Sequence, residues 1–199
     1  MDRKQFFDQL APEWEKSAPA DLSQRLERVV SMSRISPGCR ILDVGTGTGG
    51  LIRFILKAIG KEGYVLAIDI SPDMIAVAKS KGFPANVELQ VMDAHNLNVP
   101  DNSFDTVMCN AVFPHFEDKE SALRELQRVL RPGGTLVISH PIGREAVNKL
   151  HSETGSIVAE DRVPTPEQMR DLLERMGFVN IEILDEPEFY IAISRKPAS

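Results

Sequence analysis

A run of glycines between an apolar strand and a helix limits this chain to few folds. Residues 40–44 have strand character, and Asp43-Val44-Gly45-Thr46-Gly47-Thr48-Gly49-Gly50 leads into a helical pattern over residues 49–59. Gly45, Gly47 and Gly50 satisfy G-x-G-x-x-G, a spacing that lets backbone approach a ligand at the positive end of a helix. Taken alone, the motif fits NAD, FAD or S-adenosylmethionine (SAM).

Apolar runs alternate with helical periods along the rest of the chain, which is typical of an α/β sheet with crossover helices. The expected strands are residues 40–44, 64–68, 87–92, 105–110, 135–139, 178–184 and 189–194. The expected helices are residues 21–33, 49–59, 72–81, 117–130, 144–151 and 166–176. Arg131-Pro132-Gly133-Gly134 is expected to separate the helix at 117–130 from the strand at 135–139.

The link between the last two strands is short. About four residues, 185–188, join them, whereas a parallel crossover takes about a dozen residues or more. We therefore expect a mostly parallel sheet that finishes in an antiparallel hairpin.

The size, charge and cysteine content of the chain limit its domain number, its partners and its location. A chain of 199 residues, 42% hydrophobic, is expected to form one domain with a full core. The net charge of −6 argues against a nucleic-acid partner. No apolar run reaches the roughly 18–20 residues of a spanning helix, and the first residues lack a signal-peptide pattern. With only Cys39 and Cys109 there is no disulfide framework, so we expect a cytoplasmic protein without integral membrane association. Its oligomeric state is left open.

Three acids at strand ends narrow the choice of ligand. Asp69 ends the second expected strand, where a carboxylate can accept both hydroxyls of a ribose. Asp43 suits a cationic ligand and would repel a pyrophosphate. Asp93, followed by Ala94 and His95, can accept from an adenine amino group while a backbone N–H meets a ring nitrogen. Asp43, Asp93 and the terminal hairpin together favour SAM over a dinucleotide.

Five segments resemble the successive motifs of class I SAM-dependent methyltransferases. They are Ile41-Leu42-Asp43-Val44-Gly45-Thr46-Gly47-Thr48-Gly49, Ala67-Ile68-Asp69-Ile70-Ser71, Asp93-Ala94, Ser103-Phe104-Asp105 and Leu130-Arg131-Pro132-Gly133-Gly134. The match covers about residues 21–139. Within the class it is most similar to the small-molecule branch that resembles the ubiquinone/menaquinone C-methyltransferases (methyltransferase type 11-like). It implies a Rossmann-like three-layer sandwich with a seven-stranded sheet of order 3-2-1-4-5-7-6.

The resemblance also implies which residues hold SAM and release S-adenosylhomocysteine. The glycine loop would face the methionine part, Asp69 would hold the ribose, and Ile70 and Met74 would pack on adenine. Asp93 would read the adenine amino group, and Asn110 would lie near the amino-acid end. The expected cofactor-binding residues are Asp43, Gly45, Thr46, Gly47, Gly49, Asp69, Ile70, Met74, Asp93, Ala94, His95 and Asn110.

Methyl transfer from a sulfonium is an in-line displacement, so it needs alignment, and it needs a base only when the acceptor must lose a proton. His115 and His140 follow the fourth and fifth strands at the edge where ligands bind, so they are the candidate bases. Each could instead be structural. His151 could join them, although without tight spacing no metal site is expected. Phe113 and Phe116 could stack on an acceptor or pack under a loop.

Two segments outside the cofactor motifs are expected to determine which acceptor is methylated. Residues 1–34, which carry Phe6, Phe7 and Trp14, are expected to form a helical cap or lid, and residues 141–164 a substrate-side insertion; for the N-terminal part, a plain helix packed on the sheet is the alternative. The predicted function is methyl transfer from SAM to a small-molecule acceptor that the sequence does not name. The alternatives are a non-catalytic SAM-binding regulatory module and an NAD(P)-dependent oxidoreductase.

Overall fold

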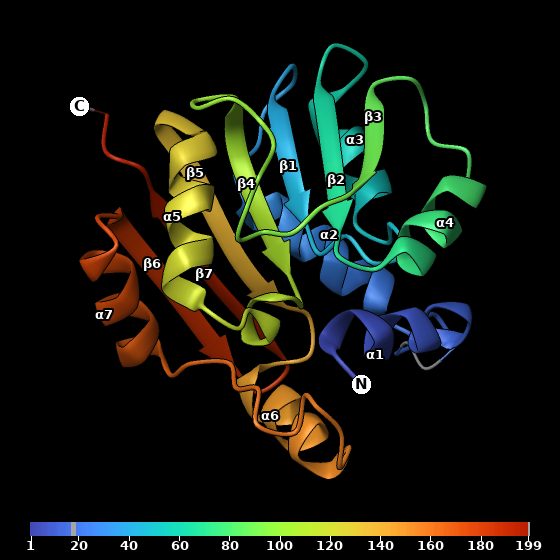
Figure 1. The fold of residues 1–199 in the computed structure, drawn as a ribbon. Helices are drawn as coiled ribbons and strands as arrows, with labels where there is room; N and C mark the ends of the chain where they lie inside the picture. The colour runs from blue at the N-terminus through green and yellow to red at the C-terminus, as the bar shows by residue number, and fades with distance from the viewer. Residues whose placement is uncertain (17–18, 199) are drawn as a thin grey trace.

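Alternating side chains give the central sheet two apolar faces, and helices cover both of them (Figure 1). The computed structural model describes residues 1–16 and 19–198, so residues 17 and 18 of the expected N-terminal cap lie outside the described residues. The strands are β1 (Arg40–Val44), β2 (Tyr64–Asp69), β3 (Val87–Val91), β4 (Phe104–Asn110), β5 (Leu130–His140), β6 (Val179–Glu186) and β7 (Phe189–Arg195).

The strand order is β3-β2-β1-β4-β5-β7-β6, which confirms the predicted sheet. Strands β1 to β5 pair in parallel, and β7 runs antiparallel to both β5 and β6. The parallel strands therefore all end at one edge of the sheet, and the segments that follow β1, β2 and β4 meet there.

The helices are α1 (Arg3–Leu10), α2 (Leu22–Met32), α3 (Ile52–Ile59), α4 (Pro72–Ser80), α5 (Lys119–Val129), α6 (Arg144–Glu153) and α7 (Pro166–Arg175), with 3-10 turns η1 (Ala11–Glu13) and η2 (Phe113–His115). Ile41 and Val65 pack with α2 and α3 on one face of the sheet. Leu42 and Leu66 point the other way and pack with α5 and α7. No helix among residues 1–16 and 19–198 is long and apolar enough to cross a membrane.

Three predicted boundaries were wrong. Helix α3 begins at Ile52 rather than near Gly49, because Gly49 has φ +81°, outside the helical range. Helix α5 ends at Val129, and β5 begins at once with Leu130 opposite Phe104. The expected break at residues 131–134 is thus an irregularity inside β5. The final hairpin is closed by residues 187 and 188 alone, because β6 continues to Glu186.

Helices α1 and α6 lie at the same end of the sheet, below the carboxyl ends of the parallel strands, while the C-terminus lies at the opposite end (Figure 1). Helix α1 begins with a capping box, in which Asp2 accepts from the Gln5 N–H and the Gln5 side chain accepts from the Asp2 N–H. These two helices bring the predicted N-terminal cap and part of the predicted insertion to the edge that carries the glycine loop.

Candidate active site

The glycine loop has a backbone that other residues could not adopt without strain. Gly45 has φ +67°, and a Cβ at this position would lie 2.3 Å from Cγ2 of Val112. Gly47 has φ +55°, and the Thr46 N–H donates to the Ile68 carbonyl at 2.9 Å. The loop is therefore fixed between the ends of β1 and β2, where its backbone can approach a ligand closely.

Asp69 is tied to this loop by its carboxylate. Oδ2 accepts from the Gly47 N–H at 2.8 Å, and Oδ1 accepts from the Ser71 N–H at 2.9 Å. Burial raises the pKa of Asp69, and these N–H groups oppose that rise. Each carboxylate oxygen has a second lone pair, so the group can still accept from a diol.

Asp43 is a buried carboxylate at the end of β1, with a side chain only 1% exposed. Its Oδ2 accepts from the Thr46 hydroxyl at 2.7 Å. Burial raises its pKa to about 7, the Thr46 hydrogen bond opposes the rise, and Asp69 adds to it. A buried anion of this kind favours a cationic ligand, so the Asp43 carboxylate fits the sulfonium and ammonium groups of SAM.

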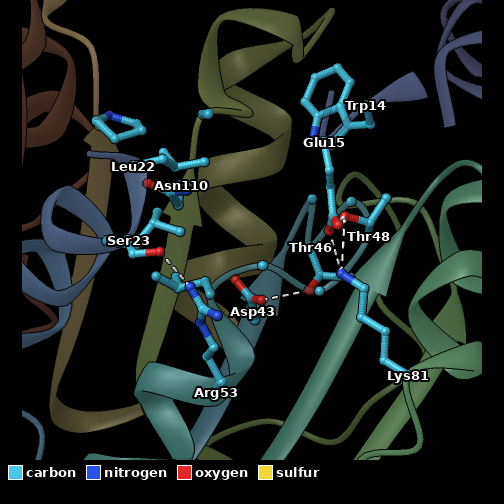
Figure 2. Close-up of a pocket in the computed structure, with 18 of the residues that line it drawn as sticks. Trp14, Glu15, Leu22, Ser23, Asp43, Thr46, Thr48, Arg53, Lys81 and Asn110 are labelled. Carbon is cyan, nitrogen blue, oxygen red and sulfur yellow. Dashed lines mark hydrogen bonds and ion pairs between the residues drawn. The ribbon is translucent and has the colours of Figure 1, made fainter. Parts of the chain in front are cut away.

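Two cavities open on either side of the glycine loop, and they share Trp14, Gly45, Gly47 and Ala111. The first, of about 570 Å³, is also lined by Asp43, Thr46, Gly49 and Asn110. Figure 2 shows it, with Asp43 hydrogen-bonded to Thr46, and Lys81 between Glu15 and Thr48. The second, of about 370 Å³, is also lined by Asp69, Ile70, Met74, Asp93, Ala94 and His95. All the predicted cofactor-binding residues thus line one of two adjoining cavities.

The end of β4 carries a strained residue between the cavities. Ala111 has φ +57°, which is uncommon for a residue with a side chain. Its N–H donates to the Ser139 carbonyl at 2.7 Å, and the Ser139 hydroxyl donates to Oδ1 of Asn110 at 3.0 Å. Neighbouring strand β5 therefore holds the tip of β4 in this conformation.

The second cavity has the features of an adenine site. Oδ1 of Asp93 accepts from the His95 N–H at 2.9 Å and lies 2.6 Å from His95 Nδ1. Ile70 is 40% exposed, whereas Met74 is buried. An apolar side chain and an acid at one wall suit a flat base with an amino group.

The three expected histidines of the carboxyl edge lie near one another, in different settings. The rings of His115 and His151 have centroids 4.8 Å apart, and His115 lines the second cavity. His140 is 1% exposed and lines neither described cavity, and its Nε2 has no hydrogen-bond partner among the described residues. Burial, with His115 and His151 nearby, lowers the pKa of His140 to about 3. Such a ring is a weak base at neutral pH.

The N-terminal segment lies over the site through polar contacts. The Ser71 hydroxyl donates to Oδ1 of Asp8 at 2.5 Å. Glu15 accepts from the Thr48 hydroxyl at 2.7 Å and pairs with Lys81. The ring of Phe7 lies edge-on to that of His115, with centroids 5.1 Å apart.

Several wall residues were not foreseen. Glu15, Arg53 and Lys81 line the first cavity, and the Arg53 guanidinium donates to the Ser23 hydroxyl at 2.7 Å. Asp161, from the polar segment after α6, lines neither cavity but was also not foreseen: its Oδ2 lies 2.7 Å from Nδ1 of His115. No motif marked these residues, because their positions depend on how distant segments pack. Phe113 and Phe116 are buried, their rings 5.6 Å apart, and Phe116 lines the second cavity.

Among the described residues, no group of three or more His, Cys, Asp or Glu side chains is arranged to hold a metal ion. The sheet order, the strained glycine loop and the acids at the ends of β1, β2 and β3 define a class I SAM-dependent methyltransferase.

Comparison with known proteins identifies the family of the chain. Residues 42–138 match the methyltransferase domain family. The ubiquinone/menaquinone biosynthesis C-methyltransferase UbiE of Hahella chejuensis is 31% identical over 174 residues, which cover 74% of this chain and 70% of the relative. The enzyme of the same name from Hydrogenovibrio crunogenus is 29% identical over 192 residues, covering 83% and 76%. The chain belongs to this family of SAM-dependent methyltransferases.

Solved structures agree on the fold. A SAM-dependent methyltransferase from Aquifex aeolicus is 22% identical and has a TM-score of 0.76, covering 98% of this chain and 100% of that chain. The protein is an enzyme that uses SAM, releases S-adenosylhomocysteine and methylates a small-molecule acceptor.

Proposed function

We propose that the chain methylates a carbon atom of a hydroxylated aromatic acceptor, with His115 as the general base. The acceptor class follows the C-methyltransferase relatives. The observation that carries the proposal is that His115 lines the same cavity as Asp69 and Asp93. A base at this position would stand beside the adenosine end of the cofactor, in a cavity that Phe7 and Phe116 also line and that an aromatic acceptor would share with them.

The residues present have separate tasks in this scheme. When bound, SAM supplies a methyl group on a sulfonium, which departs as the thioether by in-line displacement. Asp43 and the glycine loop hold the methionine end, while Asp69 and Asp93 hold the ribose and adenine. His115 accepts the proton of a ring hydroxyl, and this raises the electron density of the neighbouring carbon, which forms the new C–C bond. The proton on that carbon then leaves to solvent and restores the aromatic ring.

The finer expectations from the sequence are part of the same proposal. Residues 1–34 form a lid over the cofactor, and residues 141–164 form an acceptor-side segment of a single domain. The protein acts in the cytoplasm and without nucleic acid. The net charge of −6 supports the last point. His140 has a secondary role in this proposal, because its buried ring stays neutral and lines neither cavity.

The test uses methyl-labelled SAM and four acceptors: a 2-alkyl-1,4-naphthoquinol kept reduced, a catechol, an aryl thiol and an alkylamine. We expect a C-methylated naphthoquinol, identified by mass and by NMR. The variant His115→Gln should lose about 10²- to 10⁴-fold in kcat and retain SAM affinity. Glu160→Gln is the control, because that exposed side chain lines neither cavity. Label only on oxygen, sulfur or nitrogen, or on no acceptor, would overturn the carbon acceptor. An unchanged rate in His115→Gln would overturn the base.

A further inference from the structure

Asp161 joins two segments of the chain that are far apart in sequence. Its Oδ2 lies 2.7 Å from Nδ1 of His115, in the turn η2 after β4. Its Oδ1 accepts from Nη2 of Arg3, in α1, at 2.6 Å. The Asp161 side chain is only 6% exposed, and those of His115 and Arg3 are 11% and 19% exposed. A buried carboxylate with a different partner on each oxygen is held in one orientation.

This arrangement determines which nitrogen of His115 carries a proton. An ionised carboxylate can only accept hydrogen bonds, so Nδ1 must be the donor. In the neutral ring, Nε2 is then the nitrogen with a free lone pair. That is the tautomer a general base needs if its Nε2 is to take a proton from an acceptor.

Arg3 adds a second constraint. A guanidinium only donates, so the oxygen that faces Arg3 must always be an acceptor. Nη1 of Arg3 also donates to the Ile157 carbonyl at 3.3 Å, which ties α1 to the segment that carries Asp161. Seating of α1 and orientation of the His115 ring therefore depend on the same carboxylate.

We propose that Asp161 is a positioning residue that sets the ring tautomer of His115, and that Arg3 fixes the orientation in which it does so. The catalytic consequence rests on the proposed role of His115, whereas the tautomer does not. Because Arg3 belongs to α1, the base is correctly oriented only when the N-terminal segment is seated over the site. The orientation of the His115 ring is thus linked to closure of the N-terminal segment over the site.

The variant Asp161→Asn tests the tautomer directly. Arg3 must still meet an oxygen, so the amide NH₂ would be turned toward His115 and would donate to Nδ1. The proton would then move to Nε2. We expect nitrogen-15 NMR of the ring nitrogens to show this change for His115, with peaks assigned through single His→Gln variants. The spectrum is simple, because the chain has 4 histidines.

Two controls come with this experiment. Nδ1 of His151 lies 3.0 Å from the main-chain carbonyl of Asp161, a contact that the side-chain change leaves in place, so its ring signals should not change tautomer. Glu160→Gln makes the same chemical change at an exposed neighbour and should leave both the spectrum and kcat as in the wild type. Thermal unfolding of each variant reports whether the fold is intact.

Activity with the naphthoquinol probe gives the second readout. Asp161→Asn should lower kcat by up to about 10⁴-fold, the scale expected when a base is locked in the wrong tautomer, with little change in SAM affinity. In Arg3→Ala/Asp161→Asn the amide can rotate, so its oxygen can accept from Nδ1, and the original tautomer and part of kcat should return. Asp161→Glu should also retain the tautomer.

The two proposals fail in different ways. A wild-type His115 tautomer in Asp161→Asn would overturn the positioning role, even with His115→Gln inactive. If Asp161→Asn and Arg3→Ala/Asp161→Asn give equal spectra, Arg3 does not fix the orientation of the side chain at residue 161. If Asp161→Asn changes the tautomer while His115→Gln keeps full activity, the positioning role is upheld and the proposed base is overturned.

Discussion

The peptide N–H of Gly47 donates a 2.8 Å hydrogen bond to Oδ2 of Asp69, which ties the glycine loop to the end of β2. The same carboxylate is the proposed acceptor for the ribose hydroxyls, so it has a structural and a binding task at once. The loss of Asp69 should therefore affect both the loop and the ligand.

Asp69→Ala should weaken SAM binding by about 2 kcal/mol, or roughly 30-fold in Kd, because it leaves ribose hydroxyls and the Gly47 N–H without an acceptor. Asp69→Asn retains an acceptor oxygen and should lose less. Calorimetric titration measures both variants, and Asp73→Ala, an acid on the first turn of α4, serves as the control. Wild-type affinity in Asp69→Ala would mean that the ribose lies elsewhere.

The raised pKa of Asp43 predicts that SAM binding depends on pH. Its pKa is raised to about 7 by burial, so below pH 7 the free protein must release a proton from Asp43 to pair with a cation. SAM affinity should rise as pH increases from 5.5 to 7 and then level off. Asp43→Asn should bind SAM weakly at every pH in this range, with no such slope. A slope that persists in Asp43→Asn would assign it to another group.

The same shift has a consequence for stability without ligand. A carboxyl whose pKa is higher in the folded chain holds a proton that the unfolded chain has released, so between about pH 4 and pH 7 its contribution to stability falls as pH rises. At pH 8, ligand-free Asp43→Asn should therefore have a higher Tm than the wild type. Calorimetry at pH 5 and pH 8 checks this, since the difference should shrink at the lower pH.

Much of this site could be predicted from sequence, because its parts are local. Asp43 and Asp69 lie at the carboxyl ends of the buried strands β1 and β2, and Asp93 follows β3 after one residue. In a parallel sheet such positions meet at one edge. The hairpin was predictable from the length of its link alone. Local pattern also explains the error at α5: Leu130 continues the apolar face of the helix, yet its pairing with Phe104 places it in β5.

The contacts of the histidines could not be predicted in this way. Asp161 meets His115 across 46 residues of chain, through a polar segment without periodicity, and Arg3 reaches the same carboxylate from 158 residues away. The two predicted bases also looked alike in sequence, each at the end of a strand. Only packing separates them, because His140 is enclosed and His115 opens on a cavity.

The buried ring of His140 should make the fold sensitive to acid. Its pKa is lowered to about 3, so the unfolded chain takes up a proton near pH 6.5 that the folded chain refuses. The stability this gives is fully present above pH 6.5 and is lost as pH falls toward 3. Between pH 7 and pH 5 the loss from this residue should be about 2 kcal/mol. His140→Leu should lose less stability than the wild type over that interval in urea unfolding, and equal slopes would contradict the assignment.

Seating of the N-terminal segment should control release of the cofactor. Asp8 contacts Ser71, which follows β2, and Glu15 contacts Thr48 in the glycine loop. The double variant Asp8→Ala/Glu15→Ala should raise the dissociation rate of SAM roughly tenfold, the effect of losing two partly exposed contacts. Stopped-flow displacement measures this rate. Glu13→Ala, an exposed acid in η1, should leave it unchanged, and an unchanged rate in the double variant would argue against a lid.

Gly45 offers a test of why the loop needs glycine. An alanine there would have to keep φ near +67° and would place its Cβ 2.3 Å from Cγ2 of Val112. Backbone strain and overpacking together should cost about 2–4 kcal/mol in the free energy of unfolding. A new Cβ at residue 45 would also lie 2.5 Å from Cβ of Val112, which an alanine at 112 would keep. Gly45→Ala/Val112→Gly removes the clash and leaves the strain, so it should recover part of the loss relative to Val112→Gly. Urea unfolding of the four proteins gives the coupling free energy. A coupling free energy near zero would show that the loop moves away from Val112 in Gly45→Ala. In that case the SAM affinity of Gly45→Ala should fall, because the loop would no longer have the shape that holds the methionine end.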